Sequence, residues 1–101
     1  MKLEVIWGLL LLAALFLSCV PLQITDVKVT HDECDCVCLS WQTNQETICK
    51  VTYCEDGMCY TSQMEPEYST LHSYSLPIRK AKGVTITAIN RSGQAVSCEI
   101  K

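Results

Sequence analysis

Residues 84–93 read VTITAINRSG. Apolar side chains at positions 84, 86 and 88 alternate with threonines, which is the period of a strand that buries one face. The Asn90-Arg91-Ser92-Gly93 segment that follows is rich in turn-forming residues, so it should end the strand. The stretch therefore predicts a half-buried strand that runs into a tight turn.

Short strand signals continue on the N-terminal and C-terminal sides of this stretch. Val, Ile and Thr are frequent after residue 24, and apolar residues do not recur at helical spacing for more than a turn. Asp56-Gly57 is a hairpin signal between two such segments. We predict an all-β sandwich of about seven antiparallel strands. The predicted strands cover residues 24–29, 37–41, 49–53, 58–60, 68–76, 84–88 and 95–100.

Three segments of this pattern resemble a fibronectin type III domain, which is an immunoglobulin-like sandwich. They are Leu39-Ser40-Trp41, Val51-Thr52-Tyr53 and the stretch 84–93 with its Ala-x-Asn-x-x-Gly turn. The resemblance covers residues 24–100. It departs from the family at Lys82, where a tyrosine usually begins strand F, and it lacks the proline after the tryptophan. The many cysteines make the chain most similar to extracellular modules of class I cytokine receptors, although Cys38 lies three residues before Trp41 and does not match their Cys-x-Trp signature.

The N-terminal segment has the features of a secretory signal peptide. Lys2 precedes an apolar run from Ile6 to Leu17. This run is shorter than the roughly 20 residues that span a bilayer. We therefore predict a signal peptide at residues 1–19 and one fibronectin type III-like domain at residues 20–101. The product should be secreted and extracellular, without a membrane span after cleavage.

Size and charge narrow the function classes. A chain of 101 residues forms one small domain whose core gives only marginal stability. Its eight cysteines should therefore stabilise it through disulfides. The net charge is −3 and no block of Lys and Arg exists, which argues against a nucleic-acid partner.

One disulfide is predicted from the hairpin register. With Asp56 and Gly57 as the turn, Cys54 and Cys59 form a non-hydrogen-bonded pair, whose Cα atoms approach closely enough for a bridge. Cleavage after Cys19 would leave an odd number of cysteines.

The remaining cysteines have no assigned partners. Cys34, Cys36 and Cys38 recur at period two, so we predict that they lie on the outer face of one strand. Only Cys49 and Cys98 are left to pair with them, which leaves one thiol over. A disulfide-linked dimer is therefore one hypothesis.

The same cysteine triplet also suggests a metal site. His31 and the carboxylates of Asp32, Glu33 and Asp35 are close in sequence, but a flat strand spreads thiolates apart, and secretion favours their oxidation. We therefore predict no metal and no cofactor.

The sequence offers no recognisable catalytic arrangement. The two imidazoles are His31 and His72, and no nucleophile elbow or phosphate-binding glycine loop is present. His72 lies between Leu71 and Ser73 in a predicted strand, and we expect it on the surface. The chain is predicted not to be an enzyme.

The predicted binding surfaces are the loops at the two ends of the sandwich. Residues 42–47 and 90–94 should meet at one end, and the basic loop 77–83 should lie at the other. Asn90-Arg91-Ser92 is also a glycosylation sequon, expected in an exposed turn; otherwise Asn90 is simply a turn residue. The candidate binding residues are Gln42, Asn44, Gln45 and Arg91 at one end and Arg79, Lys80 and Lys82 at the other.

These observations favour a secreted protein-binding module with an extracellular protein ligand, such as a soluble cytokine-receptor-like or decoy protein. Two alternatives stay open. One is a disulfide-rich secreted effector of the toxin or antimicrobial type, although antimicrobial peptides are usually cationic. The other is an extracellular matrix module joined to its neighbours by disulfides.

Overall fold

The computed structural model describes residues 20–101, so the predicted signal peptide lies outside the described residues. The described part is all-β and antiparallel. Within it, no helix is long and apolar enough to cross a membrane. Its strands are β1 (Ile24–His31), β2 (Val37–Glu55), β3 (Met58–Thr61), β4 (Ser69–Ser75), β5 (Thr85–Asn90) and β6 (Ala95–Glu99).

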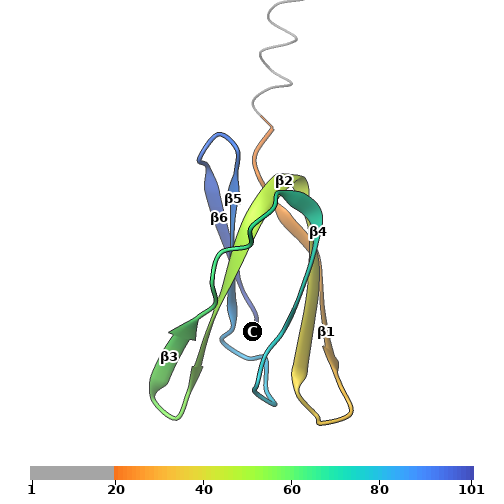
Figure 1. The fold of residues 1–101 in the computed structure, drawn as a ribbon, viewed down its shortest axis with the longest axis vertical. Helices are drawn as coiled ribbons and strands as arrows, with labels where there is room; N and C mark the ends of the chain where they lie inside the picture. Colours follow the sequence, from red (N-terminus) through yellow and green to blue (C-terminus); the bar gives the residue numbers. More distant parts are fainter. Residues whose placement is uncertain (1–19) are drawn as a thin grey trace, which may run out of the picture.

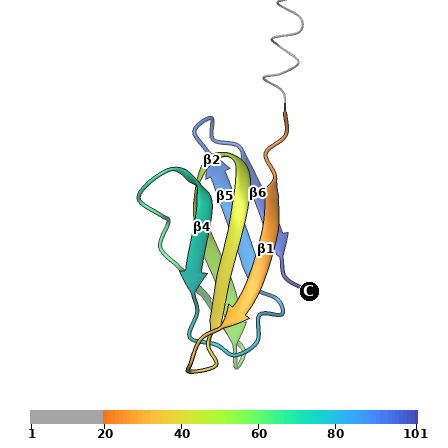
Figure 2. The same ribbon diagram turned by 90° about the vertical axis from the view of Figure 1, so that its right-hand side faces the viewer.

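Strand β2 organises the sheet because it belongs to both halves of it. Its N-terminal arm, residues 37–43, pairs with β1 on one side and β4 on the other. Its C-terminal arm, residues 47–55, pairs with β5 and then with β3, and β6 lies outside β5. Figure 1 shows β2 bending where the two halves meet, and Figure 2 shows β4, the N-terminal arm of β2 and β1 next to one another in one layer. The sheet therefore curls over on itself.

The predicted loop at residues 42–47 is wrong, because β2 continues through it for 19 residues. Side chains alternate between the inner and outer face without a break from Val37 to Val51. The bend is instead absorbed where the register between β2 and β4 shifts, between Gln42 and Thr47. The two strands predicted at 37–41 and 49–53 are thus one element.

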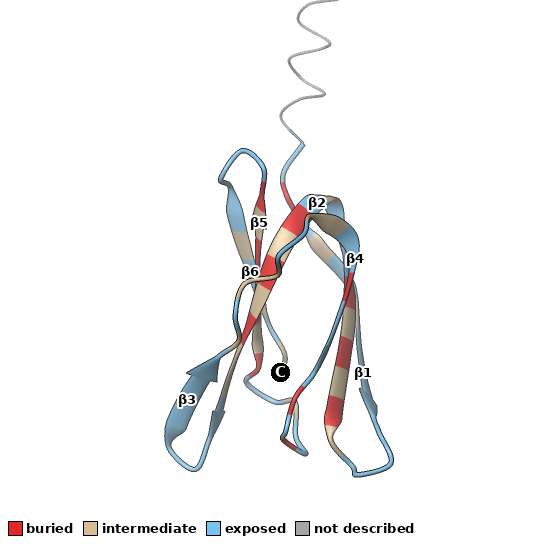
Figure 3. Ribbon diagram, in the orientation of Figure 1, coloured by how far each residue is buried: buried red, intermediate tan, exposed pale blue. Residues whose placement is uncertain are grey.

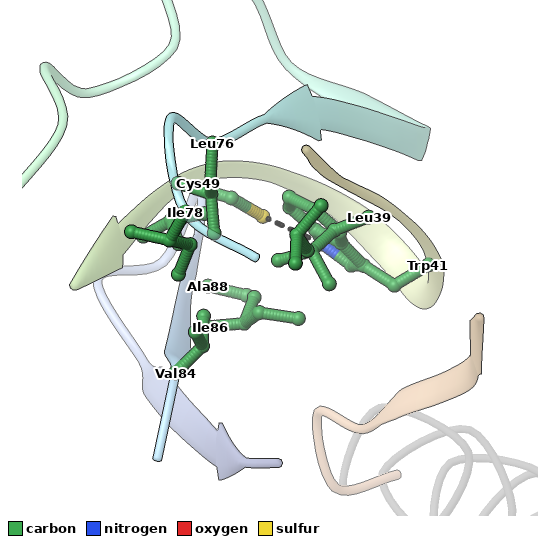
Figure 4. Packing of buried hydrophobic residues seen from close by; sticks show 10 residues of the cluster. Leu39, Trp41, Cys49, Leu76, Ile78, Val84, Ile86 and Ala88 are labelled. Atoms are coloured by element: carbon green, nitrogen blue, oxygen red, sulfur yellow. Dashed lines mark hydrogen bonds between the residues drawn. The ribbon is translucent and has the colours of Figure 1, made fainter. Parts of the chain in front are cut away.

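The hydrophobic core lies between the two halves of the curled sheet (Figures 3 and 4). Val37, Leu39 and Trp41 face it from the N-terminal arm, as their parity predicts, with exposed fractions of 0%, 2% and 3%. Burying a side chain of this size contributes about 1.5–3 kcal/mol. The rest of the cluster is Cys49, Val51, Leu76, Ile78, Val84, Ile86 and Ala88.

The cysteine triplet does not lie on one strand. Cys34 and Cys36 precede β2, and Cys38 alone belongs to it. The cause is the Asp32 carboxylate, whose Oδ1 accepts hydrogen bonds from the backbone N–H groups of Cys34 and Cys36 at 2.9 and 3.0 Å. Such local side-chain bonds compete with strand pairing, and Asp35 takes a positive φ of 63° beside them. The predicted outer-face strand here is a turn.

Candidate functional site

The β2–β3 hairpin and the loop 77–83 lie at the same end of the molecule, which we call the basic end (Figure 1). The expected Cys54–Cys59 disulfide is present across the hairpin. Its Asp56-Gly57 turn has φ values of 53° and 79°, and Gly57 adopts such a value without a steric cost. A groove of about 730 Å³ runs between the two segments. It is lined by Cys54, Glu55, Pro77, Ile78, Arg79, Lys80 and Lys82.

Buried side chains and backbone bonds fix the basic loop. Leu76 and Ile78 are buried in the core. Val37 N–H donates to the Ile78 carbonyl, and Leu76 N–H donates to the Val37 carbonyl, both at 2.8 Å. His31 Nε2 lies 2.9 Å from the carbonyl oxygen of Arg79. The loop is therefore anchored from its start up to its first cation, Arg79.

The three cations predicted to bind a partner are left unpaired. In residues 20–101 the two ion pairs are His72–Glu65 and Arg91–Glu46, so Arg79, Lys80 and Lys82 have no carboxylate partner there. Unpaired cations beside a groove attract acidic groups.

The opposite end, which we call the asparagine end, has its polar groups bonded to one another. Asn90 is 4% exposed, and its Nδ2 donates to Gln45 Oε1 and Gln94 Oε1, both at 2.9 Å. Its Oδ1 accepts from the backbone N–H groups of Ser92 and Gln94 at 3.1 and 2.9 Å. The expectation that the sequon asparagine is exposed is wrong. Glycosylation of Asn90 stays a prediction, and this burial weighs against it.

Two other residues predicted to bind a partner at this end, Asn44 and Gln45, instead form hydrogen bonds to the N-terminal residues 20–23. Asn44 Nδ2 donates to the Pro21 carbonyl, and its Oδ1 accepts from Gln23 N–H, both at 2.8 Å. Gln45 Nε2 donates to the Val20 carbonyl at 3.1 Å. Together they fasten residues 20–23 to the bend of β2.

Arg91 and Gln42 differ from these two residues. The Arg91 guanidinium lies 4.3 Å from the centre of the Tyr68 ring and 3.8 Å from Glu46 Oε2. Gln42 is exposed on the outer face of β2. The structure brings Arg91 toward the bend of β2, as predicted, but leaves Gln42 apart from the asparagine network.

His72 is buried, contrary to the expectation that it lies on the surface. Its side chain is 0% exposed and stacks on Trp41, with ring centres 5.5 Å apart. Nδ1 lies 2.8 Å from Glu65 Oε1, and Nε2 lies 3.1 Å from the Thr47 hydroxyl and 3.4 Å from that of Thr43. An imidazole with partners on both nitrogens can be buried at little cost.

Cys49 extends this buried polar cluster. Its Sγ lies 3.4 Å from Trp41 Nε1 and 3.5 Å from the Thr47 hydroxyl, and its N–H donates to Glu65 Oε1 at 2.7 Å. Burial raises the pKa of the thiol above its ordinary value of 9.0, and the hydrogen bonds from Thr47 and Trp41 oppose that rise. A groove of about 370 Å³ reaches Cys49, Glu65 and Trp41.

The buried position of Cys49 separates it from the cysteines that lie outside the core. Cys38 faces the outside of the N-terminal arm, whereas Cys49 lies in the core. Cys98 lies on β6, beyond β5, and is half-buried. Within residues 20–101, five cysteines remain thiols: Cys34, Cys36, Cys38, Cys49 and Cys98.

Sequence reasoning missed three members of the cluster: Thr43, Thr47 and Glu65. The signal for the threonines was the uninterrupted inward parity of β2, which places both on the core face, where a hydroxyl needs a polar partner. Glu65 had no such signal, because it lies outside any strand.

The chain matches no protein-family model, no curated protein and no solved structure.

Proposed function

We propose that the chain is an extracellular, non-enzymatic module of the fibronectin type III type that binds an acidic protein surface at its basic end. The strand pairing supports the fold part of this proposal. When the two arms of β2 are counted separately, β1, the N-terminal arm and β4 form one layer, and β3, the C-terminal arm, β5 and β6 form the other. Two antiparallel layers over a shared core are the arrangement of an immunoglobulin-like sandwich.

The groove at the basic end carries the binding part of the proposal. Arg79, Lys80 and Lys82 line it without a carboxylate partner among residues 20–101. Their loop is anchored by two buried side chains, so little backbone entropy is lost when a ligand binds. Unpaired cations on an anchored loop give both electrostatic attraction and orientation to an acidic partner.

The hairpin beside the groove adds apolar contact area. All four residues of β3 are exposed, and Figure 3 shows this strand as an exposed arm. Met58 and Tyr60 are 62% and 45% exposed, and the Tyr60 ring stacks on Tyr53. Tyrosine and methionine are enriched in protein–protein interfaces. A partner that covers the groove and this hairpin would bury both kinds of surface.

The proposal is tested by capture from extracellular fluid with matched baits. One bait is the wild-type chain, the second carries Arg79→Ser, Lys80→Ser and Lys82→Ser, and the control carries Arg91→Ser at the asparagine end. Captured proteins are quantified by mass spectrometry, and binding of each candidate is then measured directly at several salt concentrations.

The expected result is an acidic extracellular protein that the wild type and the Arg91→Ser control retain and the triple variant loses. Its affinity should fall as salt is raised. A partner that the triple variant binds as tightly as the wild type, or whose affinity does not change with salt, contradicts the proposed surface.

One observation favours the matrix-module alternative. Cys34 is exposed in the β1–β2 turn and remains a thiol, so it can reach a second chain. Non-reducing electrophoresis of the product should then show a covalent dimer that a Cys34→Ser variant lacks. A monomer under both reducing and non-reducing conditions contradicts this alternative.

A further inference from the structure

A cysteine, a glutamate and a histidine from three separate segments converge inside the curled sheet. Cys49 lies on β2, His72 on β4, and Glu65 between β3 and β4; one ligand atom of each lies within 4.8 Å of the others. We propose that these three side chains bind a thiophilic divalent cation of the Zn²⁺ type, with a fourth coordination position open to water. This site is separate from the basic end and does not rest on the proposed partner.

The set of donor groups fits such an ion. Thiolate, imidazole and carboxylate are the three kinds of side chain that bind zinc in proteins. When Cys49 and Glu65 are deprotonated they supply two negative charges, which a divalent cation neutralises. The thiol proton is released to solvent on binding. Three protein ligands with one open position form an accessible site rather than a closed structural one.

The sulfur is already oriented as an acceptor. Trp41 Nε1 can only donate a hydrogen bond, and it lies 3.4 Å from Cys49 Sγ (Figure 4). The Thr47 hydroxyl lies 3.5 Å from the same sulfur. Donors of this kind stabilise a metal-bound thiolate and fix its direction.

Hydrogen bonds orient the His72 imidazole so that Nδ1 faces the Glu65 ligand. His72 Nδ1 faces both Glu65 oxygens at 2.8 and 3.1 Å, and Nε2 faces the Thr47 hydroxyl at 3.1 Å. A cation on Nδ1 would replace the proton that this nitrogen shares with the carboxylate. Nε2–H would then donate to Thr47, as ligating histidines usually do to a second group.

Glu65 is the exposed ligand of the proposed site, and it lies where an ion would enter. In a tetrahedral zinc site the ligand atoms lie about 3.3–3.7 Å apart, so the 2.8 Å between Glu65 Oε1 and His72 Nδ1 must open, and separations from Cys49 Sγ of up to 4.8 Å must close by roughly 1 Å. Glu65 can move away from His72 to admit the ion, because its side chain is 29% exposed, whereas His72 and Cys49 are buried and would shift only slightly. It also lines the groove of about 370 Å³, which gives an ion a path to Cys49.

Cobalt(II) is the probe for this site, because a thiolate ligand gives it a charge-transfer absorption band. The test uses the full chain with every cysteine except Cys49 and the Cys54–Cys59 pair replaced by serine. Variants of this background are Cys49→Ser, His72→Gln, Glu65→Gln and Thr47→Val. Circular dichroism and urea unfolding establish that each variant is folded.

The expected result is a charge-transfer band that saturates at one Co²⁺ per chain, is absent in Cys49→Ser and is displaced by Zn²⁺. His72→Gln and Glu65→Gln should weaken Co²⁺ binding most, and Thr47→Val by about 10- to 100-fold. Zn²⁺ should also raise the melting temperature of the background chain. A missing band, a band that survives Cys49→Ser, or unchanged affinity in folded His72→Gln and Glu65→Gln variants would overturn the proposal.

Discussion

The two ends of the molecule use polar residues in opposite ways. At the asparagine end, Asn90 is buried and bonds to Gln45, Gln94 and the turn backbone. At the basic end, Arg79 and its neighbouring lysines lie beside a groove and have no carboxylate partner in residues 20–101. Both ends are polar in sequence. A polar loop is therefore available for binding only where its groups are not already bonded internally.

The strongest test of this contrast is the substitution Asn90→Ala. It removes four hydrogen bonds and leaves buried groups unsatisfied, so the free energy of unfolding should fall by about 2–3 kcal/mol. Urea denaturation measures this change. As the matched control, the triple Ser variant of Arg79, Lys80 and Lys82 should change stability by less than about 0.5 kcal/mol. An equal fall in the free energy of unfolding of the two variants would contradict the proposed difference between the two ends.

A second test concerns what holds the basic end together. The double variant Cys54→Ser and Cys59→Ser opens a loop of few residues, so it should cost roughly 2 kcal/mol at most. The loss should be local. Hydrogen exchange is expected to accelerate at the β2–β3 amides while the amides of Ser92 and Gln94 keep their protection. Faster exchange at both ends would show that the hairpin supports the whole domain.

The smallest expected effect is a change in the alkylation rate of Cys36, which depends on the charges near the basic end. The pKa of Cys36 is raised above 9.0, first because the folded turn partly shields its half-buried thiol from water, then because the Asp32 carboxylate is near, while Arg79 acts to lower it. Asp32→Asn keeps a hydrogen-bond acceptor but loses the charge, so the pKa should fall and alkylation of Cys36 at pH 8 should speed up. Arg79→Ser should slow it. Peptide mapping after timed alkylation measures both rates, and changes in the opposite directions would refute this assignment.

Strand positions and the core face could be predicted because they follow local alternation. Val37, Leu39 and Trp41 are buried as their parity predicts, and the Asp56-Gly57 hairpin lies where its turn residues place it. The predicted break between the strands at 37–41 and 49–53 is wrong, because polar residues 42–47 are typical of a loop whereas β2 only bends there.

The buried cluster could not be predicted, because its stability depends on pairings distant in sequence. By hydropathy Leu71 should be inside and His72 outside, yet Leu71 is 67% exposed and His72 is 5% exposed. The imidazole is stabilised by the Trp41 ring, the Thr47 hydroxyl and the Glu65 carboxylate. Its burial therefore depends on the tertiary register of β2 against β4, which no local window contains.

The unbroken course of β2 has a practical consequence for engineering. Polar residues 42–47 would invite the insertion of a tag, a protease site or new chain termini, yet an added residue there would reverse the faces of one arm relative to the other. Inward-facing side chains beyond the insertion, such as Cys49 and Val51, would turn outward. The Asp56-Gly57 turn is exposed and its tip contacts nothing at Gly57, so foreign sequence can be accommodated there without shifting either arm.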